Sequence, residues 1–176
     1  MKRKRTVWNV ILGVMLICVV CFGFFCLSGD IGVRRSNLEE DIRSSQKIAD
    51  DWVVEGMASD AMAAYISYPE DGSKHTFSIY VNHPGLSFGY FFRGGGSSSG
   101  VAEYIAKYTV EGCQESAFIS MNKQGAARLE IDDGNSVQVI DIDQNKPFAI
   151  VLPANAGAVT FYDMAGDTVE YWESPL

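Results

Sequence analysis

A short tract of glycine and serine holds the chain's closest match to a catalytic motif. Residues 96–100 read Gly-Ser-Ser-Ser-Gly and fit the G-x-S-x-G pattern of a nucleophile elbow, in which Ser98 would attack an acyl group. That serine needs a histidine to take its proton, and in hydrolases with this elbow the histidine follows the serine along the chain. Both histidines, His75 and His83, precede Ser98. The order excludes that family, and a hydrolase centred on Ser98 with another triad order stays an alternative.

Acidic side chains in one predicted hairpin are the best candidates for metal ligands. Carboxylate and amide oxygens suit Ca²⁺, and Asp141 and Asp143 are expected to share a face because side chains alternate along a strand. The spacing lacks the Gly and Glu of an EF-hand loop, since Lys146 and Leu152 stand at those positions. We therefore expect no catalytic residue, no metal and no cofactor, and keep structural calcium, or a calcium-dependent acidic hydrolase site, as alternatives. The oxygen ligands would be Asp132, Asp133, Asn135, Asp141 and Asp143.

Aromatic residues gather in the middle third of the chain, beside the glycine and serine tract. An exposed aromatic patch is typical of surfaces that bind a protein or a glycan. The same pattern is also typical of a core packed on both faces of a sheet, so both interpretations stay open. The possible interaction surface would comprise Tyr80, Tyr90, Phe91, Tyr104 and Tyr108.

The longest uncharged stretch of the chain lies close to its first residue. No residue between Arg5 and Asp30 is charged, and the run from Val7 to Leu27 is almost entirely apolar. At about 1.5 Å rise per residue, such a run crosses the ~30 Å hydrocarbon layer of a bilayer as one helix. Trp8 would lie at the headgroup level, which suits an amphipathic ring. The run therefore predicts a transmembrane span.

The charges that flank this run predict its orientation. Residues 2–5 are all basic, and basic residues are retained on the cytoplasmic side, so the remainder of the chain is expected outside the cell membrane. A cleaved secretory signal also begins with basic residues, but its apolar core is shorter and ends in small residues. The run here is longer and ends in Phe24, Phe25, Cys26 and Leu27. We expect an uncleaved signal anchor, with cleavage as the alternative.

Composition limits the partners of the part that follows the run. All 22 acidic residues follow it, against ten of the 14 basic ones, which gives that part a net charge of −12. So acidic a domain is not expected to bind nucleic acid. Its about 147 residues suffice for one domain with its own core. Cys113 is the lone cysteine after the run, so the domain must be stable without an internal disulfide, which suits a bacterial envelope protein.

Two periodicities divide the remainder of the chain. Ser36 and Glu39 have the spacing of a capping box, and the apolar residues that follow predict a helix from about Asn37 to Asp51. After Gly56 the apolar residues alternate with period two, which predicts strands. Strands are expected near 62–68, 77–81, 86–92, 101–110, 117–121, 127–131, 137–142, 148–152, 159–162 and 168–172, with a flexible loop at 94–100.

Eight to ten short strands with turn signals between them predict a mainly β fold, an antiparallel β-sandwich preceded by a transmembrane helix and a short juxtamembrane helix. The helix next to the membrane would either pack on the sandwich or act as a spacer. The predicted parts are a cytoplasmic basic tail at 1–6, a transmembrane signal anchor at 7–28, a linker and juxtamembrane helix at 29–56, and an extracytoplasmic β-sandwich at 57–176.

These features together predict a single-pass membrane protein that displays a non-catalytic β-sandwich to a protein partner or a cell-wall glycan. One alternative is the extracytoplasmic hydrolase considered above. Another is an envelope assembly or sensing subunit whose transmembrane helix pairs with a second helix, because Gly13, Cys18 and Cys21 offer small surfaces for close approach.

Overall fold

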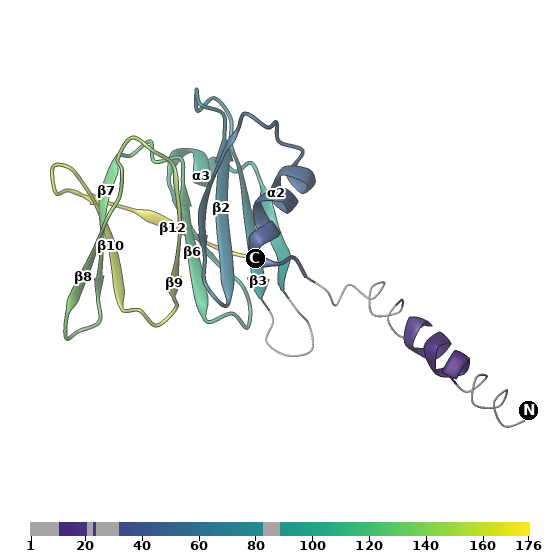
Figure 1. The fold of residues 1–176 in the computed structure, drawn as a ribbon. Helices are drawn as coiled ribbons and strands as arrows, with labels where there is room; N and C mark the ends of the chain where they lie inside the picture. Colours follow the sequence, from purple (N-terminus) through teal and green to yellow (C-terminus); the bar gives the residue numbers. More distant parts are fainter. Residues whose placement is uncertain (1–10, 21–22, 24–31, 83–88) are drawn as a thin grey trace, which may run out of the picture.

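The computed structural model describes residues 11–20, 23, 32–82 and 89–176. Within these ranges, twelve strands form three four-stranded sheets that stack face to face (Figure 1). We call them the first, middle and third sheets in the order in which the chain enters them. The prediction of a mainly β fold with antiparallel sheets is confirmed. Two details are wrong, because there are three layers of sheet rather than two and because one strand pair is parallel.

The first sheet is an antiparallel meander that is covered on its outer face by a helix. Its order is β1-β2-β3-β4, and the helix α2 packs Leu38 and Ile42, both fully buried, against Ala63, Tyr80 and Tyr90. The predicted helix therefore belongs to the packed fold rather than standing off as a spacer. The elements are a 3-10 turn at Arg35–Asn37, α2 at Leu38–Gln46, β1 at Val53–Ala58, β2 at Met62–Tyr68, β3 at Thr76–Asn82 and β4 at Tyr90–Gly96.

The middle sheet is buried on both faces. Along β6, Ala117 and Ile119 pack against the first sheet, and Phe118 between them points the other way into a core shared with the third sheet. The sheet order is β12-β5-β6-β9, and β12 runs parallel to β5. The elements are a short helix α3 at Ser99–Glu103, β5 at Ile105–Thr109, β6 at Glu115–Ser120, β9 at Phe148–Pro153 and β12 at Tyr171–Pro175.

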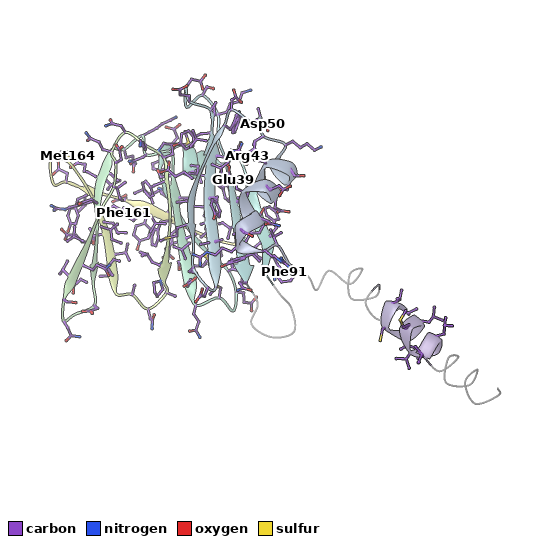
Figure 2. All side chains as sticks on the ribbon, viewed as in Figure 1. Glu39, Arg43, Asp50, Phe91, Phe161 and Met164 are labelled. Atoms are coloured by element: carbon purple, nitrogen blue, oxygen red, sulfur yellow. The ribbon has the colours of Figure 1, made fainter. Side chains whose placement is uncertain are left out.

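The third sheet closes the other side of the middle sheet and leaves its own outer face exposed. Phe161, fully buried, packs against Phe118 with ring centroids 5.5 Å apart and lies between the two sheets in Figure 2. Leu129 and Ile131 complete this core. The order is β11-β10-β7-β8, with β7 at Ala126–Asp132, β8 at Val137–Asp141, β10 at Ala158–Asp163 and β11 at Thr168–Val169.

The helix next to the first sheet differs from its prediction at both ends. Asn37 rather than Ser36 occupies the N-cap, and its side chain makes no capping bond; the Ser36 hydroxyl donates to the Asn37 side chain at 2.8 Å instead. The helix stops at Gln46 because Lys47 takes a left-handed conformation (φ 52°). The strand β1 then begins at Val53. The sequence did not predict this strand, because its first apolar residues continue the helical spacing. The predicted boundary between residues 56 and 57 falls inside this strand.

The glycine and serine tract is not one loop. Gly94 to Gly96 complete β4, and Ser99 begins α3, so the strand predicted at 101–110 starts only at Ile105. A β-carbon built on Gly95 would lie 2.5 Å from the Phe77 carbonyl oxygen, which explains the need for glycine there. The strand predicted at 168–172 is split between two sheets as β11 and β12, and in the stretch predicted at 86–92 the described strand begins at Tyr90.

Residues 11–20 form a helix ahead of the sheets, and all ten are exposed. Its large apolar side chains are between 48% and 66% accessible. None of the helices in the described ranges has both the length and the apolar character needed to cross a bilayer. Val7, Trp8 and Leu27, which mark the ends and inner edge of the predicted span, lie outside the described residues.

Candidate functional site

Ser98 and His75 do lie side by side, but not as a nucleophile and its base. The Ser98 backbone N–H donates to His75 Nε2 at 3.1 Å, and the Ser98 hydroxyl oxygen accepts from the Gly100 N–H at 3.2 Å. Ser98 is therefore the N-cap of α3, and the imidazole of His75 engages its backbone. This arrangement places no base on the serine hydroxyl. His83 lies outside the described residues.

His75 also lines a cleft of about 660 Å³ at the end of α2. Lys47, Lys74 and Trp52 line it too. Asp71, which does not line the cleft, lies near Lys74: the hydrogen bonds from Ser73 lower the pKa of its carboxyl most, and the charge of Lys74 lowers it further.

The acidic residues predicted as metal ligands divide into two groups. In the β7–β8 hairpin Asp132 pairs with Val137 beside the turn, whereas Asp141 pairs with Arg128 at the other end. Asp133 is committed to the turn, where it accepts from the Asn135 and Ser136 backbone N–H groups, and these bonds lower its pKa. In the described part of the chain, no three His, Cys, Asp or Glu side chains are close enough to hold one metal ion.

Asp141 and Asp143 nevertheless line one groove, although Asp143 lies beyond the end of β8. They line a groove of about 300 Å³ where β1, the end of β8 and β9 meet, and Glu55 of β1 lines it from the opposite side. The walls between these carboxylates are apolar. The groove is lined by Glu55, Gly56, Ile140, Asp141, Ile142, Asp143, Lys146, Pro147, Phe148, Ala149 and Ile150.

The carboxylates of the groove are held by groups on its rim. The Tyr68 hydroxyl donates to Glu55 Oε2 at 3.0 Å. Burial, followed by this bond and by the charges of Glu55 and Asp143, raises the pKa of Tyr68 to about 12. Lys146 Nζ lies 3.7 Å from Asp143 Oδ2. Among the described residues, neither Glu55 nor Asp141 has a cationic partner within salt-bridge distance.

One wall of the groove is the outer edge of β1. In an antiparallel pair, alternate residues turn their backbone N–H and C=O groups toward the partner strand. The Ser59 N–H donates to the Met62 carbonyl at 2.8 Å, so the backbone of Ser59 points toward β2. Because the direction alternates along the strand, the backbone groups of Met57 also point toward β2 and those of Gly56 point away from it. A β-carbon on Gly56 would run into the Ala64 carbonyl oxygen of β2.

The other wall is the outer edge of β9. The Ala154 N–H donates to the Gln114 carbonyl at 2.8 Å, and the same alternation turns the backbones of Ala149 and Val151 away from β6. Val151 N–H donates to the sulfur of Met57 at 3.1 Å and closes one end of the groove. Ala149, two residues nearer the open end, lines the groove itself.

Three of the predicted surface aromatics belong to the interior. Tyr80, Tyr90 and Tyr108 are less than 5% exposed. Tyr80 and Tyr90 lie on the first sheet beneath α2, and Tyr108, on β5 of the middle sheet, packs against the first sheet. Phe91 is half-buried. Tyr104 alone of the five is 41% exposed, and its ring lies 5.5 Å from that of Trp172, which is 60% exposed.

Sequence reasoning missed Glu55, the residue that completes the groove. It stands in a stretch whose apolar residues continue the helical spacing of α2, and the alternation of β1 is too short to outweigh that spacing. The one signal for Glu55 in the sequence was its position directly before Gly56, after which the spacing of apolar residues changes from helical to period two. Comparisons with protein-family models, curated proteins and solved structures find no match to this chain.

Proposed function

We propose that this chain is a single-pass membrane protein that displays a non-catalytic binding domain on the outer side of the membrane. The observation that carries the proposal is the helix over residues 11–20, whose apolar side chains no described part of the chain covers. It lies within an uncharged run long enough for a bilayer and preceded by four basic residues. An exposed apolar helix of this kind is stabilised by lipid.

Binding rather than catalysis is supported by the geometry of the domain. The Ser98 hydroxyl is engaged in capping α3, and its neighbour His75 contacts the backbone. The groove between β1 and β9 instead combines apolar walls, carboxylates and strand edges, which are features of recognition sites. We therefore assign the groove as the binding site, and a bacterial envelope as the setting in which a protein partner or a wall polymer meets it.

Labelling from outside the cell tests the anchor and its orientation. Met164 is 72% exposed at the tip of the third sheet (Figure 2), so a Met164→Cys variant offers an accessible thiol. We expect a membrane-impermeant maleimide to label it in intact bacterial cells, at full-length mass and in the membrane fraction. The unsubstituted chain gives the background from its own four cysteines.

Two results would contradict this proposal. Labelling that appears only after lysis would place the domain in the cytoplasm. Labelling on a shorter product in the medium would mean that the apolar run is a cleaved signal.

A further inference from the structure

We propose that the groove between β1 and β9 binds an extended segment of a partner protein through one lysine or arginine side chain. The inference rests on the binding role assigned above and adds the chemistry of the partner. It is argued from the walls, the charges and the backbone edges of the groove.

The walls suit the aliphatic stem of a long cationic side chain. Ile140, Ile142 and Ile150 lie along the groove, and Phe148, 8% exposed, lies among them. Lysine and arginine bury their methylene groups along such apolar surface while the charged head stays at the polar rim. At about 300 Å³ the groove has room for a side chain rather than for a folded element.

The charges at the rim favour a cation. Glu55, Asp141 and Asp143 face the groove against the single cation Lys146, and the domain around them is strongly acidic. The chain's own Lys146 already lies at this rim, 3.7 Å from Asp143 Oδ2, so an ammonium group fits beside these carboxylates. Tyr68 occupies one oxygen of Glu55. Its second oxygen and the Asp141 carboxylate are placed to receive the incoming head group.

The backbone edges favour an extended segment over a free amine. Gly56 on β1 and Ala149 on β9 line the groove and present main-chain groups that are turned away from their own sheets. An extended segment that lies along either edge gains main-chain hydrogen bonds there, while one of its side chains enters the groove. The acidic rim disfavours an anionic wall polymer at the same place.

The test is a titration of the full chain in dodecyl maltoside micelles, followed by fluorescence anisotropy. The probe is the labelled peptide acetyl-Thr-Val-Lys-Val-Thr-amide, and matched peptides carry glutamate or norleucine in place of lysine. We expect the lysine peptide to bind at low salt, the norleucine peptide to bind at least about tenfold more weakly, and the glutamate peptide not to bind. Free cadaverine, which has the charge without the backbone, should bind more weakly than the lysine peptide.

Paired variants locate the binding. The variant E55Q/D141N/D143N removes three charges from exposed groove residues and should weaken the lysine peptide about tenfold or more. The control E111Q/D167N/E170Q removes three charges from exposed residues elsewhere and should change affinity less than twofold. A benzoylphenylalanine next to the lysine should crosslink to 53–58 and 140–150. Thermal melting confirms that both variants fold.

Equal weakening by the two variants, binding of the glutamate peptide, or crosslinks outside β1 and β9 would each overturn the inference, as would absence of binding at millimolar peptide. Cadaverine that binds as tightly as the lysine peptide would assign the groove to free amines instead. The titration does not depend on orientation in a membrane, and the maleimide experiment does not depend on the groove, so either proposal can fail alone.

Discussion

Asn122 links the turn after β6 to the Asp143 end of the groove through one buried side chain. It is 5% exposed and left-handed (φ 56°), a conformation that asparagine tolerates better than most residues. Its amide donates to the carbonyls of Ala126 at 3.0 Å and Asp143 at 3.1 Å, and its carbonyl accepts from Ala126 N–H at 2.8 Å. The residue thus closes the turn between β6 and β7 and holds the Asp143 side of the groove.

Replacing Asn122 with alanine should lower the free energy of unfolding by about 2–4 kcal/mol, because buried backbone groups lose their partners. Urea denaturation measures the change. Asn155→Ala, at an exposed turn, is the control and should stay within about 0.5 kcal/mol. A loss in Asn122→Ala no larger than that of the control would show that water replaces the amide.

His75 gives the fold a dependence on pH in the acid range. Burial lowers its pKa below 6.5, opposed by the contact of Nε2 with the Ser98 carbonyl oxygen at 3.1 Å and assisted by the charge of Lys123. The folded state therefore favours the neutral imidazole. Its contribution to stability is complete above the unfolded pKa, about 6.5, and is lost as the pH falls through the folded pKa, because the unfolded chain binds the proton first.

We expect urea denaturation midpoints to fall between pH 7.5 and 5.5 in the unsubstituted chain and to fall less in His75→Gln. The difference between the two chains isolates the imidazole from the many carboxylates. Identical pH profiles would mean that His75 titrates alike in the folded and unfolded chains.

The residue predictions were limited by tertiary contacts, which the spacing of residues along the chain does not reveal. Asp141 and Asp143 both line the groove, but β8 ends at Asp141 and Ile140 and Ile142 line the groove too, so strand alternation is not what brings the two carboxylates together. The surface role of Tyr80 and Tyr108 is wrong because both faces of their sheets are covered, and alternation alone does not reveal a third layer. Glu55 lies in β1, where sequence reasoning predicted no strand.

Arg43 fastens the helix α2 to the start of β1. Its guanidinium donates to Glu39 Oε1 at 2.9 Å, to the Ala49 carbonyl at 3.3 Å and to the Trp52 carbonyl at 3.1 Å. Figure 2 shows Arg43 beside Glu39 and Asp50, where the chain leaves the helix. Lys47 ends the helix, and the Arg43 side chain links the helix α2 to the connection that leads into β1.

Arg43→Ala should lower the free energy of unfolding by about 1–3 kcal/mol and raise amide hydrogen exchange across 47–53. Glu39→Gln, which removes the ion pair and spares the carbonyl contacts, should cost less than about 1 kcal/mol. Equal effects of the two substitutions would assign the stabilisation to the ion pair and not to the carbonyl contacts.

At the scale of elements, the sequence predicted most strands in place and failed where tertiary contacts decide. Gly94 to Gly96 are predicted as a loop because glycine has low strand propensity, yet the close approach of the Phe77 carbonyl oxygen requires glycine at Gly95 in β4. The break at Glu170, where the chain passes from the third sheet to the middle one, leaves no local signal.

The whole molecule is closed by its last strand. On β12, Tyr171 enters the core of the third sheet, with its ring 5.3 Å from Phe118, and Glu173 pairs with Lys107 of β5 at 2.7 Å. Trp172, on the same strand, stays exposed.

Deleting residues 171–176 should destabilise the domain by more than about 3 kcal/mol, since it opens one core and the edge of β5. Near-ultraviolet circular dichroism and size-exclusion chromatography should report lost packing and self-association. Trp172→Ala, on the same strand, should leave the elution volume in size-exclusion chromatography unchanged, because Trp172 is exposed. A truncated chain that stays monomeric and well packed would show that β12 is dispensable.

The parallel pairing of β12 with β5 also sets an order of events during biosynthesis. Lys107 and Glu173, which face each other across this pair, are 66 positions apart. A chain that emerges from its N-terminus therefore carries β5 with one edge paired to β6 and the other edge open until β12 arrives, and contacts this distant in sequence form slowly. The core between the middle and third sheets, against which Tyr171 packs, is not complete before that moment. Interrupted synthesis or export thus leaves an open strand edge, which is the form most prone to join another chain.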